Sequence, residues 1–184
     1  SAILIDFIEY IDKIVNRPFR QDHYRRKKMI TVTLPGEKPF LFRHLVLDYN
    51  GTLACDGALI AGVESKLNQL AELLDVHIIT ADTFGKCKTS CRGIKGRIYV
   101  LAEGEGMLEK DRFVKALGPE SVIAMGNGAN DALMLERSAL GIAVVGPEGA
   151  SLTALQKARL VVGDINSGLD LLLNTKRLVA TLRK

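Results

Sequence analysis

The stretch that decides the fold runs His44-Leu45-Val46-Leu47-Asp48-Tyr49-Asn50-Gly51-Thr52-Leu53. Its first four residues are mostly apolar and predict a buried strand, which Asn-Gly-Thr cannot continue. Asp48 therefore falls at the carboxyl end of that strand, the edge at which open α/β sheets bind ligands. A carboxylate held there among the backbone amides of a tight turn can attack a phosphoryl group and carry it as an aspartyl phosphate. Taken alone, an Asp-x-Asn-Gly motif is equally compatible with an ordinary strand-to-turn aspartate.

A second strand end carries a hydroxyl group. Residues 76–80 are a short apolar run that closes on Thr80 and is followed by Ala81 and an Asp-Thr pair, which is typical of a helix start. The Thr80 hydroxyl can donate a hydrogen bond to a phosphoryl oxygen. A threonine that closes a strand is more often only a turn or cap residue, so this position alone favours the structural role.

A third segment combines glycines with oxygen-bearing side chains. Residues 122–125 form a strand-like run that breaks into Gly126-Asn127-Gly128-Ala129-Asn130-Asp131 before a helical stretch. The glycines permit close backbone approach, and two amides and a carboxylate supply oxygen ligands for a hard cation. Such oxygens between a strand and a helix are hard to explain as core, so they indicate a cation site.

An amphipathic helix is expected to begin at Lys110 and to stop at Gly118, just before that strand. A lysine in the first turn of such a helix can extend over the strand ends and neutralise a phosphoryl group. Most helix lysines are only solvated, and spacing alone favours that interpretation.

Together these four segments resemble the haloacid dehalogenase superfamily: a nucleophilic Asp in an Asp-x-x-Gly-Thr turn, a hydroxyl after the second strand, a helix lysine and an acidic glycine-rich turn. The resemblance runs from about Leu45 to the C-terminus. Within that superfamily, residues 80–85, 126–135 and 177–183 are similar to the small prokaryotic proteins called soluble P-type ATPases.

The resemblance implies an α/β fold, a Rossmannoid three-layer sandwich with a central parallel sheet. It also implies a role for each matching residue. Asp48 would be the nucleophile, working with catalytic groups at Asn50, Thr80 and Lys110. The residues that would hold the phosphoryl group are Asn50, Gly51, Thr52, Thr80, Ala81 and Lys110. Those that would hold Mg²⁺ are Asp48, Asn50 through its backbone carbonyl, Asn127 and Asp131, with Gly126, Gly128 and Asn130 in support.

Two positions depart from the superfamily pattern. Phosphatases of the superfamily usually carry a second Asp where this chain has Asn50, and a metal-binding Asp where it has Asn127. An amide cannot perform acid/base work, which is typically worth roughly 10²–10⁴-fold, so unactivated alkyl phosphates are expected to be poor substrates. An amide at position 127 is expected to weaken Mg²⁺ binding, because Mg²⁺ prefers anionic oxygen.

Composition predicts one catalytic domain with an N-terminal extension. The chain has 184 residues, of which 47% are hydrophobic and 25% charged, enough for a single α/β core over residues 29–184. No apolar run reaches the ~18 residues of a membrane span and no signal-peptide pattern is visible at the start, so we expect a cytoplasmic protein without a membrane partner. Three scattered cysteines also fit a reducing compartment.

Residues 1–28 predict an amphipathic helix followed by a basic linker. The apolar stripe of the helix must be buried on its own domain or on a second copy, which suggests a homo-oligomer. The basic residues after it could contact nucleic acid or anionic lipid, but a solvated linker is the better interpretation, and we do not expect a nucleic-acid partner.

The remaining pattern predicts a hairpin over residues 29–42 and then alternating helices and strands. The expected helices are 63–74, 84–91, 110–117, 130–137, 151–157 and 167–182, and the expected later strands are 98–102, 142–145 and 160–162. The intervals on either side of the second strand leave no room for a cap domain. An open site would accept a large substrate or be covered by a neighbouring subunit.

The sequence therefore favours a Mg²⁺-dependent, capless phosphohydrolase acting on a phosphorylated small molecule or phosphoprotein through Asp48. The alternative is a degenerate member that binds a phosphorylated ligand or partner without turnover. Asn50 favours the alternative. The residues that favour the enzyme are Asp48, Thr52, Thr80, Lys110 and Asp131.

Overall fold

The computed structural model describes residues 28–81, 86–101 and 106–183. The predicted N-terminal helix and nearly all of the basic linker lie outside these residues, and so does the Asp-Thr pair after Ala81.

The centre of the molecule is a six-stranded sheet with the order β10-β9-β8-β3-β6-β7. All neighbouring strands in it are parallel. Their bounds are β3 (His44–Asp48), β6 (Asp75–Thr80), β7 (Arg97–Val100), β8 (Val122–Gly126), β9 (Leu140–Val144) and β10 (Leu160–Val162). The chain runs outward from β3 to one side and then returns to the other side through β8. This reversal between β3 and β8 is a topological switch point, where the carboxyl ends of α/β strands form a crevice.

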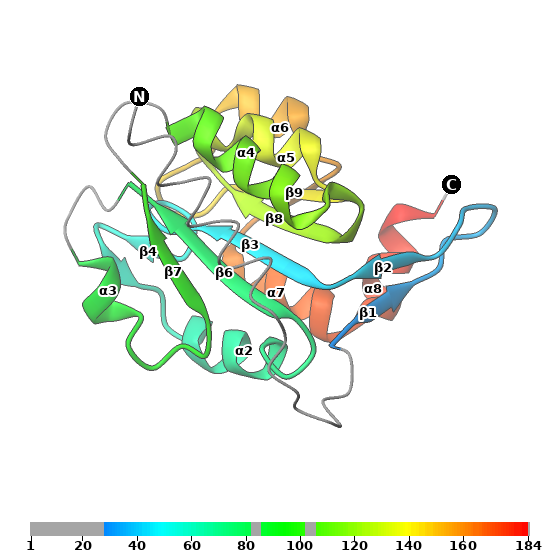
Figure 1. Ribbon diagram of the computed structural model, residues 1–184, viewed down its shortest axis with the longest axis horizontal. Helices are drawn as coiled ribbons and strands as arrows, with labels where there is room; N and C mark the ends of the chain where they lie inside the picture. Colours follow the sequence, from blue (N-terminus) through cyan, green and yellow to red (C-terminus); the bar gives the residue numbers. More distant parts are fainter. Residues whose placement is uncertain (1–27, 82–85, 102–105, 184) are drawn as a thin grey trace.

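Helices cover both faces of the sheet and make three layers (Figure 1). One face carries α4 (Gly106–Leu117), α5 (Ala132–Arg137) and α6 (Leu152–Lys157). The short turn η1 (Pro119–Ser121) follows α4, and η2 (Ala129–Asp131) leads into α5. The other carries α2 (Val63–Leu70), α3 (Cys87–Ser90) and α7 (Ile165–Leu173). The three-layer α/β fold class predicted from the sequence is therefore confirmed.

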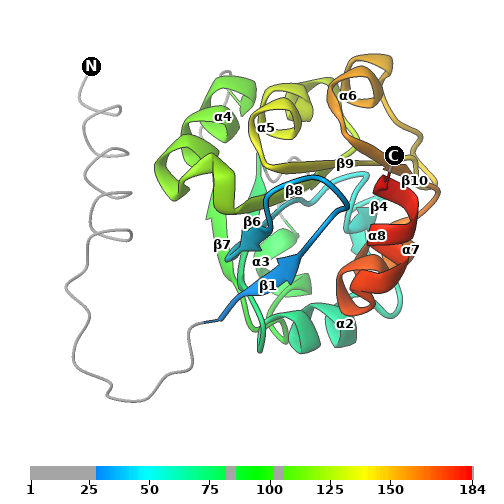
Figure 2. The ribbon, with the colours of Figure 1, turned by 90° about the vertical axis from the view of Figure 1, so that its right-hand side faces the viewer.

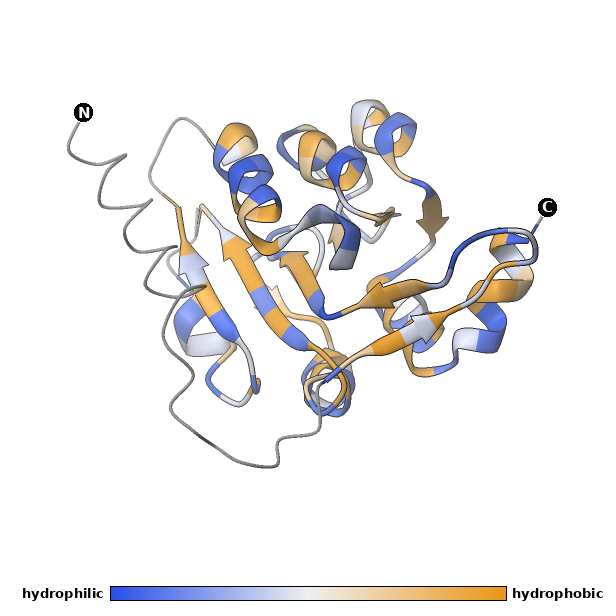
Figure 3. Cartoon of the chain, turned by 45° about the vertical axis from the view of Figure 1, so that its right-hand side comes forward, coloured by the Kyte–Doolittle hydropathy of each residue, from blue (hydrophilic) through white to orange (hydrophobic). Residues whose placement is uncertain are grey.

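The side chains of each strand point alternately to the two faces of the sheet, so each strand contributes to two separate hydrophobic cores. Leu45 and Leu47 join the core under α2 and α7, whereas Val46 joins the core under α4 and α5. The strands are accordingly mostly apolar, with polar bands at a few positions, while the helices are apolar on one side only (Figure 3). Asp48 has the same parity as Val46, so it lies on the face covered by α4.

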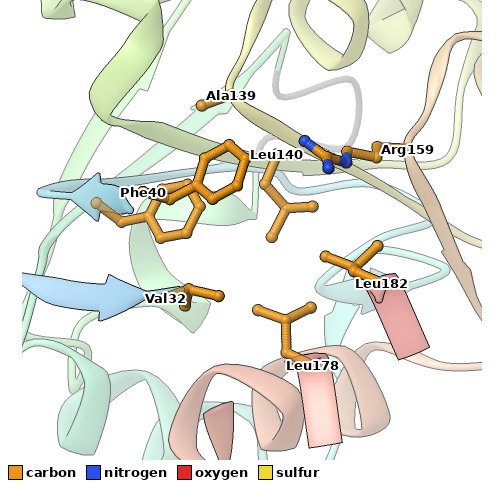
Figure 4. Close-up of a pocket in the computed structure, with 8 residues that line it drawn as sticks. Val32, Phe40, Ala139, Leu140, Arg159, Leu178 and Leu182 are labelled. Atoms are coloured by element: carbon orange, nitrogen blue, oxygen red, sulfur yellow. The ribbon is translucent and has the colours of Figure 1, made fainter. Parts of the chain in front are cut away.

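A predicted hairpin extends the sheet at its amino end. β1 (Ile30–Val32) and β2 (Phe40–Phe42) pair antiparallel and pack against α8 (Thr175–Leu182), seen edge-on in Figure 2. Figure 4 shows where the two meet: Val32, Phe40 and Leu178 surround a small apolar cavity of about 10 Å³. The Arg159 guanidinium closes its rim 5.0 Å from the centre of the Phe40 ring.

Several element boundaries differ from the predictions. Helix α4 begins at Gly106, so Lys110 lies in its second turn and the predicted first-turn position is wrong. Helix α2 ends at Leu70, before the predicted end at 74, because residues 71–74 form turns. A second small hairpin, β4 (Ala54–Cys55) with β5 (Ala58–Leu59), follows the Asp48 turn and was not predicted. Its strands are too short to show an alternating pattern.

The intervals that could hold a cap contain only small elements. Between β3 and β6 the chain forms β4, β5 and α2, and the described part of residues 81–109 contains only α3, β7 and the start of α4.

No described helix combines the length and the apolar character needed to cross a membrane.

Candidate active site

Strand β3 ends in a tight turn that fixes Asp48. The backbone N–H groups of Thr52, Leu53 and Ala54 all donate to the Tyr49 carbonyl, at 2.9–3.2 Å. Gly51 makes the turn possible, because its φ of 77° is a left-handed conformation that glycine adopts without strain. A Cβ atom at this position would also lie 2.3 Å from the Asn127 Nδ2 atom. The turn and the β8 loop are therefore in direct contact.

Lys110 reaches the end of β3 from helix α4. Its side chain is only 1% exposed, and its Nζ atom donates to Asp48 Oδ1 and to Asp131 Oδ1, each at 2.6 Å. One ammonium group therefore joins two carboxylates that come from different loops. Lys110 is therefore buried and bonded to two carboxylates, and the alternative that it is an ordinary solvent-exposed helix lysine is excluded.

Asp131 holds the loop that follows β8. Its Oδ2 atom accepts the backbone N–H groups of Asn127 and Gly128, at 3.0 and 2.9 Å. Because its Oδ1 atom is engaged by Lys110, both oxygens already have protein donors. A Cβ on Gly126 would lie 2.5 Å from the Asp131 carboxylate, so this glycine permits the close approach.

Thr52 and Asn127 complete the cluster. The Thr52 hydroxyl lies 3.2 Å from Asp48 Oδ2 and 3.1 Å from Asn127 Oδ1, and its single hydrogen can serve one acceptor at a time. The orientation of the Asn127 amide is fixed from the other side, because its Nδ2 atom donates to the Gly149 carbonyl at 3.0 Å.

The charges in this cluster do not cancel. Two carboxylates share one ammonium group, so the site carries one net negative charge when all three are ionised. Burial first, and then the negative charge of Asp131, raise the pKa of Asp48 to about 6, although Lys110 and Thr52 act in the opposite direction. Burial alone would lower the pKa of Lys110, but the two carboxylates raise it above its ordinary value, so the lysine stays protonated.

The residues present fit a divalent cation. The Asn50 Oδ1 atom is buried and accepts no hydrogen bond from the described residues, so this oxygen has lone pairs to offer. Asp48 and Asn127 lie beside it in the chain fold with further oxygens, and the surplus negative charge favours a cation. Oxygen ligands of this kind suit Mg²⁺. Asp131 accepts three protein donors where Asp48 accepts two, so Asp131 has fewer lone pairs left for a metal.

The structure brings most predicted site residues to one place. Asp48, Thr52, Lys110, Asn127 and Asp131 form one bonded cluster. The other predicted positions lie around it. Thr80 is buried at the end of β6, one residue beyond the Ile79 that pairs with Asp48, and Ala81 after it is exposed.

Asn130 is exposed on η2, and its Oδ1 atom would lie 2.4 Å from a Cβ on Gly128. Gly128 therefore allows Asn130 to lie close to the loop backbone.

Sequence reasoning missed the loop between β9 and α6. Besides the Gly149 contact, the Ser151 N–H donates to the Asn127 carbonyl at 2.8 Å, so this loop holds Asn127 at both its amide and its backbone. The loop also reaches the unpredicted hairpin, because the Glu148 carboxylate accepts the Asp56 N–H at 2.9 Å. A signal was present, since Gly-Pro-Glu-Gly follows a strand at the same sheet edge.

Sequence comparison identifies relatives, although no protein-family model matches the chain. The uncharacterized protein MJ0073 of Methanocaldococcus jannaschii is 52% identical over 84 residues, which cover 44% of this chain and 90% of that protein. MJ0072 of the same organism is 44% identical over 39 residues, 21% of this chain and 89% of that protein. A phosphoserine phosphatase of Archaeoglobus fulgidus is 48% identical over 50 residues, but these cover only 27% of this chain and 14% of that enzyme.

Solved structures with the same fold include phosphatases. The 3-deoxy-D-manno-octulosonate 8-phosphate phosphatase of Moraxella catarrhalis, determined with magnesium and phosphate, matches with a TM-score of 0.56 at 16% identity, over 77% of this chain and 94% of that one. An apo phosphoserine phosphatase matches with a TM-score of 0.58 at 12% identity, over 70% of this chain and 98% of that one. The chain belongs to the same protein family as MJ0072 and MJ0073, and its fold is that of the haloacid dehalogenase superfamily.

Proposed function

We propose that the protein is a Mg²⁺-dependent phosphohydrolase that forms an aspartyl phosphate on Asp48 and favours activated leaving groups. The observation that carries this proposal is the Asp48 carboxylate, 6% exposed at the end of β3, with a buried ammonium group 2.6 Å away. Two loops and a helix lysine converge on this carboxylate, which is more than a purely structural aspartate requires.

The chain's own residues account for the steps. An Asp48 oxygen attacks phosphorus, the bond to the leaving oxygen breaks, and the leaving oxygen departs with its electron pair. Lys110 lies where it can transfer its hydrogen bond from Asp48 to a phosphoryl oxygen as the aspartate gives up its charge. The Thr80 hydroxyl and the turn at residues 50–52 would hold the remaining phosphoryl oxygens, and the Gly51 and Thr52 N–H groups, which donate to the Ala54 and Tyr49 carbonyls in this structure, would have to turn toward the phosphoryl group. Water then hydrolyses the acyl phosphate.

Asp48, the Asn50 carbonyl and Asn127 would hold the metal, with Asp131 orienting the loop that presents Asn127. Bound there, Mg²⁺ supplies neutralisation of charge on the phosphoryl group. The site is less negative than one with aspartates at positions 50 and 127, which eases the approach of an anionic substrate and weakens the hold on the cation.

Asn50 determines which leaving groups the site accepts. An amide can neither protonate the departing oxygen nor activate water, so an oxygen that is stable as an anion is favoured. Aryl and acyl phosphates have such leaving groups, and alkyl phosphates do not. The open, capless site suits either a phosphorylated small molecule or a phosphoprotein in the cytoplasm, and a second copy of the chain is the natural cover for it.

A binding module without turnover is the second candidate. The amides at Asn50 and Asn127 favour it, because both replace groups that superfamily phosphatases use. The two candidates differ in one measurable species, the phosphorylated form of Asp48.

The test offers p-nitrophenyl phosphate and acetyl phosphate to the wild type and to Asp48→Asn during a Mg²⁺ titration. We expect Mg²⁺-dependent turnover and an acid-stable phosphoenzyme in the wild type, and loss of both in the variant, because an amide cannot attack phosphorus. Circular dichroism of the variant checks that the fold is retained. Residual turnover above a few per cent of wild type would exclude Asp48 as the nucleophile, and absence of both signals in the wild type would leave the binding module.

A further inference from the structure

A second charged feature lies beside the proposed active site and has no role in it. Residues 86–97 contain five basic side chains and no acidic one: Lys86, Lys88, Arg92, Lys95 and Arg97. All five are exposed, and we name them the basic surface. The remaining described residues carry nearly equal numbers of acidic and basic side chains, so the excess charge is concentrated here.

Few negative groups offset this charge. Within the described part of the chain, Lys95 alone among the five forms an ion pair, with Glu72 at 3.0 Å. The Glu64 carboxylate also borders the surface, since it would lie 2.3 Å from a Cβ on Gly93. Both acids belong to α2 and the turn after it, at one flank. Exposed lysines and arginines that lack partners attract an anionic ligand and are screened by salt.

The basic surface begins at the catalytic edge of the sheet. The segment leaves β6 after Thr80, passes through α3 and enters β7 at Arg97, and the Leu101 N–H returns to the Thr80 carbonyl at 2.8 Å. Strand β7 is two strands from β3, about 10 Å. Arg97 opens β7 at its amino end, so the basic surface runs away from the catalytic edge over roughly the 13 Å that the four residues of β7 span.

The composition of the surface distinguishes between two kinds of anionic partner. A stable protein interface usually has an apolar core with aromatic residues. Residues 86–97 expose no large apolar side chain, because Cys87, Cys91 and Ile94 are buried and Gly93 and Gly96 have none. Exposed cations without an apolar centre fit a phosphate backbone, where charge supplies most of the affinity.

We propose that the basic surface binds the phosphate backbone of a nucleic-acid strand. Within the described residues no cap lies over the neighbouring sheet edge, so a long strand can pass it. The sequence-based expectation of no nucleic-acid partner concerned residues 17–28, which form a different segment.

Binding is measured first, in the Asp48→Asn background, where hydrolysis cannot interfere. The probe is a 20-nucleotide single-stranded DNA with a 5′-phosphate and a 3′-fluorescein, followed by fluorescence anisotropy between 50 and 200 mM NaCl. The test variant carries Lys88→Glu and Arg92→Glu. The control carries Lys176→Glu and Arg177→Glu, two exposed cations on α8, at the opposite end of the molecule from α3 (Figure 1).

We expect the test variant to lose at least tenfold in affinity at 50 mM NaCl and the control less than twofold. The slope of log affinity against log salt is negative, and its magnitude should decrease by about 1.4 in the test variant, for two lost single-strand phosphate contacts. Equal losses in the two variants would overturn the proposal, and so would a wild-type dissociation constant above about 10⁻⁴ M at 50 mM salt. Displacement of the DNA by poly-glutamate at equal charge concentration would identify an acidic protein instead and would also overturn it.

Turnover is measured separately in the chain with Asp48 intact. The test variant should keep p-nitrophenyl phosphate turnover within twofold, because the basic surface contributes no residue to the charged cluster around Asp48. A loss of turnover as large as the loss of DNA affinity would show that the two substitutions damage the whole protein and would overturn the assignment of DNA binding to this surface. Failure with p-nitrophenyl phosphate alone would remove the proposed function and leave the binding result standing.

Discussion

Strands β3 and β6 lie beside two polar clusters that differ in charge, and β6 supplies a residue to only one of them. At the carboxyl edge, Asp48, Lys110 and Asp131 form the charged cluster, with N–O distances of 2.6 Å. Nearer the amino ends of the strands, His44 and His77 form the neutral cluster with Tyr99: the two imidazoles are 3.2 Å apart, and His77 Nδ1 lies 3.4 Å from the Tyr99 hydroxyl.

The neutral cluster lies under α4, and within the described residues neither histidine forms an ion pair, although the Asp75 charge acts on His44 and raises its pKa against the larger lowering effect of burial. His77 packs edge-on against Phe113 of α4, with ring centres 5.5 Å apart. Burial first, and then the nearby His44 and Arg97, lower the pKa of His77 to about 3. The ring is therefore uncharged at neutral pH. At the carboxyl edge, by contrast, loops provide donors and acceptors, and an anionic ligand can reach the carboxylate. Charged side chains therefore lie at the carboxyl edge of these strands, which a ligand can reach, and uncharged imidazoles lie under α4, which covers them.

The largest expected effect comes from removing the Lys110 ammonium group, because the charged cluster then has no cation. Lys110→Ala leaves Asp48 and Asp131 buried without a cation, which costs about 3–5 kcal/mol of unfolding free energy when one partner of a buried pair is lost. Turnover of p-nitrophenyl phosphate should fall at the same time, because the cation that faces the phosphoryl group is gone. Urea denaturation at pH 7.5 and steady-state kinetics measure the two effects.

The matched control is Lys115→Ala in the same helix. Lys115 is half exposed and pairs with Asp111 at 2.8 Å, and Asp111 keeps a second partner in Arg137. Its removal should cost less than about 1 kcal/mol and leave turnover within twofold. If Lys115→Ala were the more damaging change, the choice of Lys110 as the catalytic lysine would be wrong.

The neutral cluster is expected to lower the free energy of unfolding at acid pH. The folded-state pKa of His77 is far below its ordinary value of 6.5, so the unfolded chain gains a proton that the folded chain excludes. Its contribution to stability is complete above about pH 6.5 and decreases as the pH falls toward 3, by about 2 kcal/mol between pH 7 and pH 5. Urea midpoints measured across this range should show the loss.

His77→Phe is the control for acid sensitivity, since a phenyl ring keeps the packing against Phe113 and cannot take up a proton. The free energy of unfolding should depend less steeply on pH in this variant than in the wild type. Asp48 titrates in the same range in both proteins, so the difference between their slopes isolates His77. Parallel slopes would show that His77 is protonated in the folded protein.

The two clusters also differ in how far the sequence could predict them. Asp48 and Asp131 can be predicted from the sequence because each lies in a glycine-containing turn after an apolar strand, and parallel strands end at the same sheet edge. Lys110 can be predicted because it lies near the start of an amphipathic helix. The neutral cluster depends on register: Val46 pairs with His77, which places His77 on the same face as His44. Register cannot be obtained from either strand alone, and the sequence contains no local signal for it.

Residues that contact the site through loops were predictable only in part. The Asp56-Gly57 pair signals a tight turn, which could have identified the β4–β5 hairpin. Nothing local indicates that the Tyr49 hydroxyl donates to the Gly57 carbonyl at 3.0 Å, or that Gly149 orients Asn127. These contacts join segments whose relative placement only the folded sheet determines.

The smallest expected effect comes from adding a carboxylate to the charged cluster. Asn50→Asp supplies the acid/base group that superfamily phosphatases have at this position. The side-chain oxygen at residue 50 is buried without a donor, so an aspartate there would lie in a dry, already negative site that favours its protonated form. A protonated carboxyl group could donate its hydrogen to the leaving oxygen, and the resulting carboxylate could then activate water.

Turnover of alkyl phosphates by Asn50→Asp should therefore rise by one order of magnitude or more, about 1.4 kcal/mol in the barrier. Aryl phosphates should gain less in their first step, because their leaving groups need little protonation, although faster hydrolysis of the aspartyl phosphate would benefit every substrate. The wild type should accumulate that intermediate from acetyl phosphate, and the variant should clear it. Rapid-quench measurement of the phosphoenzyme, alongside rates for a series of leaving groups, separates the two steps. A variant that is inert toward every substrate, together with a wild type that forms no phosphoenzyme, would show that the charged cluster binds phosphate without transferring it.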